Sequence, residues 1–192
     1  SGLGLLGHRN SDLSTPAAAT LPPYWRAMSA SAPTVRPGLP GDAGAIAAIY
    51  AEGIADRVGT FRTDEPEAGE VLEWLAERGP LLVAEAAGTV VGWTRVMSYD
   101  HRCAYDDVGE YTIYVARSAR GTGVGAALLA ALTGAAKEAG YDKLVGLLFA
   151  SNGASRALAA RCGFREVGVH VRHGRLDGAW KDVVVVERLL GA

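Results

Sequence analysis

The sequence predicts a mixed α/β domain built around a central sheet. From residue 33 onward, segments with apolar residues at helical spacing alternate with short runs rich in β-branched and aromatic residues. The 192 residues suffice for one domain of ordinary size, and 49% hydrophobic against 21% charged residues is typical of a globular protein with its own core. Glycine, at 25 residues, is about twice as frequent as usual. Those glycines must belong to a linker, to turns or to a binding site.

The first half of the domain predicts a strand, two helices and a hairpin. A short strand at residues 34–36 precedes a helix that begins at Asp42, a good N-cap, and carries apolar residues on one face. A second helix is predicted to start at residues 63–66, where a proline suits the first turn, and to end at residues 79–80. The hairpin consists of residues 81–86 and 90–97 around a short turn.

The second half alternates strands and helices. A polar loop at residues 98–107 is followed by a strand at 110–115, a Gly-rich turn, and a helix that ends at Gly140. The remaining predicted elements are a strand at 143–149, a helix at 152–162, and two final strands at 165–171 and 181–187.

Residues 1–32 differ from the rest of the chain. They are rich in Ser, Pro, Ala and Thr and show no periodic apolar face. We interpret them as a flexible N-terminal extension or a tag, and residues 33–192 as the folded domain.

Charge and composition disfavour several classes of partner. A net charge of −2 gives no basic field for nucleic acid, and no apolar run is long enough to span a membrane. The two cysteines, Cys103 and Cys162, predict free thiols rather than a disulfide framework, and the four histidines complete no metal-site pattern, so no metal is expected. With no signal-peptide pattern at its start, the chain is expected to be cytoplasmic.

The Gly-rich turn at residues 115–126 carries the strongest functional signal. A strand, a Gly-rich turn and a helix together present backbone N–H groups to a phosphate, and Arg120 adds a cationic donor at the rim. A pyrophosphate is a natural ligand. Ala126 and Ala127 stand where a P-loop would need Lys and Ser or Thr, and the turn comes too late in the chain for a dinucleotide fold. A turn that only connects strand and helix stays an alternative.

The segment Arg120-Gly-Thr-Gly123-Val-Gly125 matches the Arg/Gln-x-x-Gly-x-Gly/Ala signature of the GCN5-related N-acetyltransferase (GNAT) superfamily, whose order of elements resembles residues 33–189. The resemblance implies a mostly antiparallel central sheet with flanking helices and a splayed strand pair that holds acetyl-CoA. It also implies which residues contact acetyl-CoA: Ile113, Tyr114, Val115, Arg120, Gly121, Thr122, Gly123, Val124, Gly125, Ala126, Asn152 and Ser155.

Four separated pieces resemble phosphinothricin N-acetyltransferases, which acetylate the amino group of small amino-acid-like compounds. The pieces are Phe61-Arg-Thr63, Arg102-x-Ala-Tyr105, the strand that begins at Glu110, and the segment at residues 178–183. This resemblance implies a substrate site that contains Phe61, Arg62, Thr63, Arg102 and Tyr105, and it suggests a homodimer. Arginine suits the anionic groups of such substrates, although arginines that only make the surface soluble are the alternative.

Acetyl transfer requires a neutral amine, so a base must take a proton from the ammonium. Glu110 matches the carboxylate base of the resembled family, and a solvated carboxylate at a strand end is the alternative. A backbone N–H, that of Val115, is expected to stabilise the oxyanion. Ala159 stands where relatives have Tyr or His to protonate the leaving thiolate, so no dedicated acid is expected.

The sequence therefore predicts an enzyme that transfers acetyl from acetyl-CoA to a small amine such as phosphinothricin or methionine sulfoximine. Two alternatives remain at this point. One is acetylation of a peptide or protein N-terminus, with the segments around residues 61–63 and 98–107 forming an open groove. The other is a CoA-binding sensor without turnover, which the alanine at position 159 keeps open.

Overall fold

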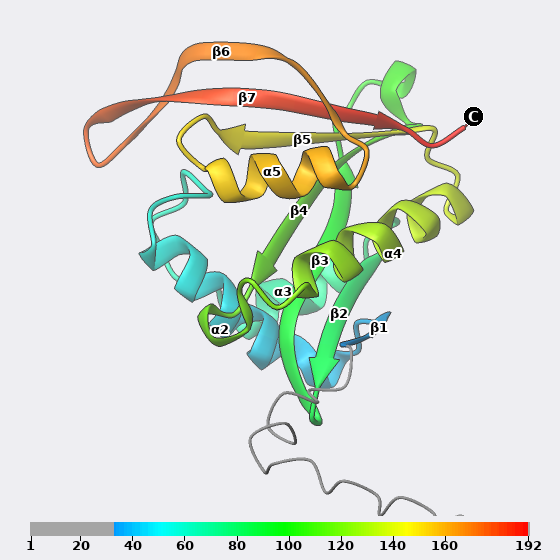
Figure 1. The fold of residues 1–192 in the computed structure, drawn as a ribbon. Coiled ribbons are helices and arrows are strands. Elements are labelled where there is room, and N and C mark those ends of the chain that lie inside the picture. Colours follow the sequence, from blue (N-terminus) through cyan, green and yellow to red (C-terminus); the bar gives the residue numbers. More distant parts are fainter. Residues whose placement is uncertain (1–32, 192) are drawn as a thin grey trace, which may run out of the picture. The chain divides into compact units, whose positions relative to one another are not determined.

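Seven strands form one sheet in the computed structural model, which describes residues 33–191 (Figure 1). Their order across the sheet is β1-β2-β3-β4-β5-β7-β6, and every neighbouring pair is antiparallel except β4 and β5. The predicted mixed, mostly antiparallel sheet is confirmed. The predicted extension at residues 1–32 lies outside the described residues. The strands are β1 (Thr34–Pro37), β2 (Leu81–Ala86), β3 (Thr89–Ser98), β4 (Val108–Val115), β5 (Lys143–Phe149), β6 (Arg165–Leu176) and β7 (Ala179–Leu189).

The parallel pair at the centre of the sheet is incomplete. β4 and β5 pair only over Val108–Lys143, Gly109–Leu144 and Glu110–Val145. Beyond Glu110, β4 continues along β3 while β5 continues along β7, so the two strands diverge, as Figure 1 shows. A strand edge in the middle of a sheet leaves backbone N–H and C=O groups without a neighbouring strand. This is the splayed pair that the family resemblance implies.

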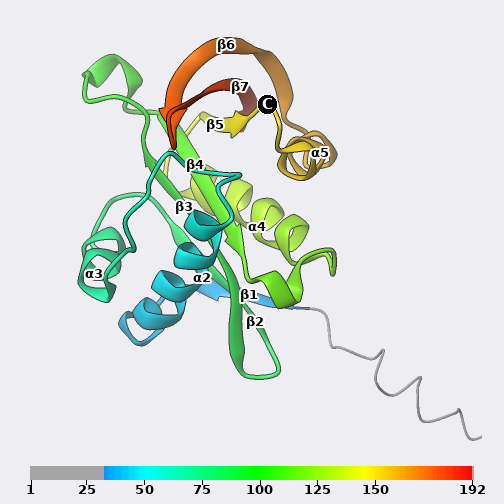
Figure 2. The same ribbon diagram turned by 90° about the vertical axis from the view of Figure 1, so that its left-hand side faces the viewer.

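Helices cover both faces of the sheet (Figure 2). On one face lie α2 (Ala43–Ala55) and α3 (Ala68–Leu75), which pack with Trp93 and Val83 in one apolar cluster. On the other face lie α4 (Val124–Glu138) and α5 (Gly153–Arg161), which pack in a second cluster with Tyr111 and Phe164. Because side chains alternate along β4, that strand contributes Tyr114 to the first cluster and Tyr111 to the second.

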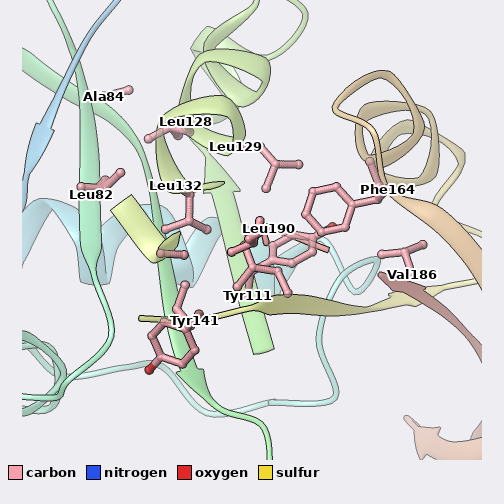
Figure 3. Packing of buried hydrophobic residues seen from close by; sticks show 14 of the residues in the cluster. Leu82, Ala84, Tyr111, Leu128, Leu129, Leu132, Tyr141, Phe164, Val186 and Leu190 are labelled. Atoms are coloured by element: carbon pink, nitrogen blue, oxygen red, sulfur yellow. The ribbon is translucent and has the colours of Figure 1, made fainter. Parts of the chain in front are cut away.

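The larger core lies between α4 and the sheet. Leu128, Leu129 and Leu132 lie on one face of α4 and are fully buried against Tyr111 and Phe164 (Figure 3). Each of these leucines contributes about 1.5–3 kcal/mol by leaving water. The core fixes α4 and β4 to each other, so the loop between them has two anchored ends.

One predicted helix start is right and the other is wrong. Asp42 is the N-cap residue of α2, as predicted, but its side chain does not cap the helix. Asp42 also ends a 3₁₀ turn (Pro40–Asp42), and its carboxylate accepts from the backbone N–H of Leu39 and pairs with Arg36 at 2.7 Å. The second helix starts at Ala68, not at residues 63–66. Proline disfavours the helical conformation in the residue before it, which keeps Glu65 out of a helix.

The last two strands are longer than predicted. β6 extends to Leu176 and β7 begins at Ala179. The turn between them consists of Asp177 and Gly178, both with positive φ (49° and 79°), as a tight hairpin requires. Residues 172–176 and 179–180, which the prediction leaves outside the strands, lie in β6 and β7, and β6 is an edge strand whose side chains are largely exposed. Within the described residues, none of the helices is long and apolar enough to cross a membrane.

Candidate active site

The donor loop, residues 120–125, connects the end of β4 to α4. Gly121 and Gly123 have φ of +76° and +94°, and a Cβ at either position would meet no atom within 4 Å. The left-handed backbone, rather than crowding, is therefore what requires glycine there. No side chain caps α4 and no acidic residue lies in its first turn. Its first N–H groups thus stay available, which is the arrangement that binds an anion such as a pyrophosphate.

The other loop residues act through backbone or packing. The Thr122 hydroxyl donates to the carbonyl of Ala119 at 2.7 Å, and the side chain of Val124 is buried in the core. A Cβ on Gly125 would lie 3.1 Å from Leu158, so glycine allows α4 and α5 to approach closely. The loop is therefore shaped by the side chains or close packing of Thr122, Val124, Gly125 and the half-buried Ala126. Their backbone groups are the part of the loop that can face a phosphate.

Arg120 is held by two groups of the protein. Its Nε donates to the carbonyl of Val115 at 3.0 Å, and its Nη1 lies 2.7 Å from the carboxylate of Asp56. Arg117 binds the same carboxylate at 2.6 Å, and the two guanidiniums hold the pKa of Asp56 below its usual value, with Arg117 the larger cause. Arg120 therefore links the end of α2, the end of β4 and the donor loop, besides placing positive charge at the rim.

The open edge of β4 presents alternate backbone groups to the gap. The N–H of Ala116 donates to Val91 of β3 at 2.9 Å. Since backbone groups alternate along an antiparallel strand, those of Tyr114 also face β3, whereas those of Ile113 and Val115 face the gap toward β5. The gap therefore offers the N–H of Val115 and the backbone of Ile113 to a bound chain, while Tyr114 contributes its side chain on the opposite side.

Asn152 has two hydrogen bonds within the chain. Its Oδ1 accepts from the backbone N–H of Ser155 at 3.0 Å, which caps α5, and its Nδ2 donates to the carbonyl of Val58 at 3.0 Å. Asn152 thus fixes the start of α5 to the loop that follows α2. This cap joins Asn152 and Ser155, the two residues at the start of α5 that the family resemblance assigns to acetyl-CoA.

The acceptor pocket opens on the sheet face that carries α2 and α3. It has a volume of about 280 Å³. The lining residues come from seven separate segments of the chain: Tyr50, Gly59, Thr60, Phe61, Met97, Glu110, Tyr111, Thr112, Tyr114, Leu147, Phe149, His173 and Val183. Glu110, Thr112 and Tyr114 share one face of β4 because side chains alternate along a strand.

Glu110 lies where the parallel pairing ends, at the apex of the gap. It is half-buried, and burial raises the pKa of its carboxyl group. None of the ion pairs among residues 33–191 involves Glu110. A carboxylate held without a cation in a partly dry pocket is a stronger base than one in water.

The pocket wall near α2 is aromatic. The rings of Tyr50 and Tyr114 lie 4.7 Å apart, and Tyr114 stacks on Trp93 at 5.2 Å. Burial raises the pKa of Tyr114, so its hydroxyl stays protonated and serves as a hydrogen-bond donor. On the other side, Phe61 packs edge-on against Phe149 at 4.8 Å.

Of the five residues predicted to bind substrate, the structure brings only Phe61 into the acceptor pocket. The Arg62 guanidinium binds Asp64 at 2.8 Å and Glu70 at 2.6 Å, and Thr63 is exposed. Arg102 is 71% exposed in its side chain and pairs with Asp100 at 2.9 Å. Both arginines are therefore neutralised by neighbours outside the pocket.

Tyr105, the fifth residue predicted to bind substrate, lines a second cavity of about 320 Å³. This cavity lies along the same face of β5, since Val145 lines it and Leu147, two residues further, lines the acceptor pocket. Its polar residues include Lys143 and His170. The predicted segments around residues 61–63 and 98–107 are therefore split between the two cavities.

Several pocket residues were missed by sequence reasoning. Thr112 could have been found, because it is two residues from Glu110 on the same strand. Met97 could also have been found, since it is opposite Glu110 in the hairpin register. Leu147, Val183 and His173 gave no signal, because only the pairing of β5, β7 and β6 brings them to Glu110.

Ala159 is 1% exposed and packs in the core beside Phe164. Its backbone carbonyl accepts from Phe164 at 3.0 Å, and its methyl group carries no proton to give. The described residues also contain no group of three or more His, Cys, Asp or Glu side chains placed to bind a metal ion.

A splayed strand pair, a glycine loop at an uncapped helix start and a pocket with an unpaired carboxylate are the arrangement expected of an acetyl-CoA-dependent acetyltransferase. The family model described as "Acetyltransferase (GNAT) family" matches residues 47–164, a span that contains Glu110 and the donor loop. The chain belongs to this family.

Two curated relatives resemble the chain over most of its length. A phosphinothricin N-acetyltransferase of Alcaligenes faecalis is 35% identical over 164 residues, which cover 83% of this chain and 83% of the relative. An L-methionine sulfoximine/L-methionine sulfone acetyltransferase of Pseudomonas aeruginosa is 28% identical, over 83% of this chain and 94% of the relative.

Two solved structures have the same fold. A phosphinothricin acetyltransferase from Sinorhizobium meliloti in complex with acetyl-CoA has a TM-score of 0.78 at 29% identity, covering 83% of this chain and 89% of that one. A ribosomal-protein-alanine N-acetyltransferase from Brucella melitensis has a TM-score of 0.78 at 30% identity, covering 81% and 99%.

Proposed function

We propose that this acetyltransferase transfers acetyl from acetyl-CoA to the primary amine of a small amino-acid-like substrate, such as phosphinothricin or methionine sulfoximine. The relatives named for those substrates match the chain over 83% of its length. The acceptor pocket, at about 280 Å³, has room for a molecule of that size.

The position of Glu110 carries the proposal. Glu110 is the last residue of β4 that pairs with β5, so it lies between the acceptor pocket and the gap. The ammonium of the substrate gives a proton to Glu110, directly or through water, and the freed nitrogen lone pair attacks the thioester carbon. A positioned base of this kind contributes about 10²–10⁴-fold in rate.

The negative charge that develops on the acetyl oxygen requires a donor. The N–H of Val115, which faces the gap, fills this role, and one such donor is worth about 10²-fold or more. The attacking nitrogen, positively charged in the tetrahedral intermediate, loses its second proton to water. The carbon–sulfur bond then breaks, the CoA thiolate leaves and takes a proton from water, and Glu110 gives its proton to solvent. Ala159 supplies no acid, and a thiol pKa of about 8.5 makes the thiolate a tolerable leaving group.

The donor side binds CoA through backbone groups. The N–H groups of the donor loop bind the pyrophosphate with Arg120 beside them, and the backbones of Ile113 and Val115 hold the pantetheine arm. Asn152 and Ser155 border the same arm. This assignment agrees with the left-handed glycines and the uncapped start of α4.

A panel of acceptors tests the proposal. Thiol release from acetyl-CoA is measured with phosphinothricin, methionine sulfoximine, methionine sulfone and a Ser-Ala peptide. We expect turnover with the amino-acid analogues, with kcat/KM above about 10⁴ M⁻¹s⁻¹ for the best of them. Turnover with the peptide alone would support N-terminal acetylation, the activity named for the Brucella neighbour. Tight CoA binding without any turnover would support a sensor.

We also propose that the enzyme is a cytoplasmic homodimer. Cys103 and Cys162 are both free thiols, as in a reducing compartment. The edge strand β6 exposes Val167, Val169 and Val171, at 50%, 53% and 71%, and a second copy would cover them. Sedimentation should give a dimer mass that Val169→Asp reduces to a monomer; a wild-type monomer would contradict this.

A further inference from the structure

The acceptor pocket contains a base but little to bind an anion. Apart from Glu110, its described lining consists of tyrosines, threonines, apolar side chains and one histidine, His173. Arg62 and Arg102 lie outside the lining and are paired with carboxylates. An amino-acid-like substrate brings a carboxylate next to its amine, and a carboxylate that leaves water needs hydrogen-bond donors.

A bulge in β6 brings His173 to the pocket. Along β6 the paired residues advance from His170 to Gly174, four positions, while their partners on β7 advance from Val183 to Lys181, two positions. The two extra residues interrupt the alternation of side chains between the two faces of β6. Such bulges occur beside active sites because they re-aim a side chain.

The bulge is held from both sides. Arg172 has a φ of +51°, unusual for a residue with a side chain, and its N–H donates to the carboxylate of Asp182 on β7 at 2.7 Å. Gly174 lies against the ring of Phe61, where an added Cβ would be 2.8 Å from the ring carbons. The strained backbone is therefore fixed by its neighbours, which is common where a side chain has a functional position.

His173 is exposed, and its imidazole lies beside that of a second histidine. Its ring centroid lies 4.9 Å from that of His170, with the planes 32° apart. His170 lines the second cavity, so the two rings stand side by side at the boundary between the cavities. His173 and Glu110 therefore line the same acceptor pocket, from opposite halves of the sheet.

We infer that His173 recognises the carboxylate of the acceptor substrate by donating an imidazole N–H to it. This inference rests on the proposed function. A neutral imidazole has one N–H donor and a protonated one has two, so His173 can bind the anion in either form. Glu110 then takes the proton from the amine while His173 holds the carboxylate, and the enzyme selects amines that carry a neighbouring carboxylate.

Kinetics with two matched acceptors test the role of His173. Methionine sulfone and its carboxamide, which lacks the negative charge, are compared in wild type, His173→Leu, His173→Lys and Arg102→Gln. For His173→Leu, which has no hydrogen-bond donor, we expect KM for methionine sulfone to rise about tenfold or more, the usual effect of losing a hydrogen bond to a charged group. KM for the carboxamide and for acetyl-CoA should change less than about twofold, and His173→Lys should recover most of the loss.

The outcomes separate the two proposals. Absence of wild-type turnover with methionine sulfone overturns the proposed function and this inference with it. An active His173→Leu that loses affinity for both acceptors equally, or for neither, overturns the inference alone. A selective loss in Arg102→Gln, with none in the His173 variants, would assign the carboxylate to Arg102 instead.

Discussion

The two sides of the gap between β4 and β5 are built in different ways. Apart from Asn152 and Ser155, the donor side is one continuous stretch of chain, from the end of β4 through residues 120–125 into α4, and it acts mainly through backbone groups. The acceptor pocket is assembled from seven separate segments and acts through side chains. A site made from one stretch leaves a pattern in the sequence, whereas a site assembled by folding leaves scattered residues.

The two sides also differ in their electrostatics. On the donor side, Asp56 is paired with Arg117 and Arg120, so each of these charges has a neighbour of opposite sign. In the acceptor pocket Glu110 has no cationic partner among the described residues, and burial alone raises its pKa. The fold therefore neutralises charge where it holds a loop in place and leaves a charge unpaired where a proton has to move.

The largest expected effect comes from removing the unpaired acid. We expect Glu110→Gln to lower kcat about 100-fold, with acetyl-CoA KM nearly unchanged, because the amide cannot accept the amine proton. The wild-type rate should rise with pH through an acid limb whose midpoint lies above the ordinary glutamate pKa of about 4.3, and the variant should lack this limb. Steady-state kinetics across pH measure both.

The same substitution should affect stability in the opposite direction. A carboxyl whose pKa is raised by folding binds its proton more tightly in the folded state, so it lowers stability as pH rises from the unfolded pKa through the folded one. Glu110→Gln should therefore be more stable than wild type at pH 7, and the gain should fade below about pH 4. Glu85→Gln is the control, because Glu85 pairs with Arg36 at 3.1 Å, and it should keep kcat. Equal activity losses in both variants would reject Glu110 as the base.

A smaller effect is expected on the donor side, from the backbone alone. Gly123→Ala should cost about 1–2 kcal/mol at a φ of +94° and raise the acetyl-CoA KM about tenfold. Gly134→Ala, in the middle of α4, is the matched control, since neither position has an atom within 4 Å of an added Cβ. The control should leave KM unchanged and stabilise the helix by up to about 1 kcal/mol. If the two variants show the same acetyl-CoA KM, the left-handed turn is not needed for binding.

The difference between the donor side and the acceptor pocket also separates what could be predicted from the sequence from what could not. The sheet class, the element order and the donor loop were predicted because they depend on local periodicity and on glycines close together in the chain. The family resemblance assigns Arg62 and Arg102 to the substrate, where arginine would suit an anion, but Asp64, Glu70 and Asp100 already bind them. His173 was missed since its position depends on a bulge held by Asp182, and no local pattern encodes that contact.

The smallest expected effect tests whether Arg62 stabilises the fold or binds substrate. Arg62 bridges Asp64 and Glu70 with a side chain only 23% exposed, so Arg62→Gln should cost about 1 kcal/mol and lower Tm by about 2–4 °C. KM for the acceptor should stay within about twofold of wild type. Arg102→Gln is the matched control: its one ion pair is with Asp100, next to it on an exposed loop, and an exposed pair adds little, so its Tm should not change. A rise in acceptor KM without any fall in Tm in Arg62→Gln would show that Arg62 leaves its carboxylates to bind substrate, and that the acceptor pocket gains a cation when it is filled.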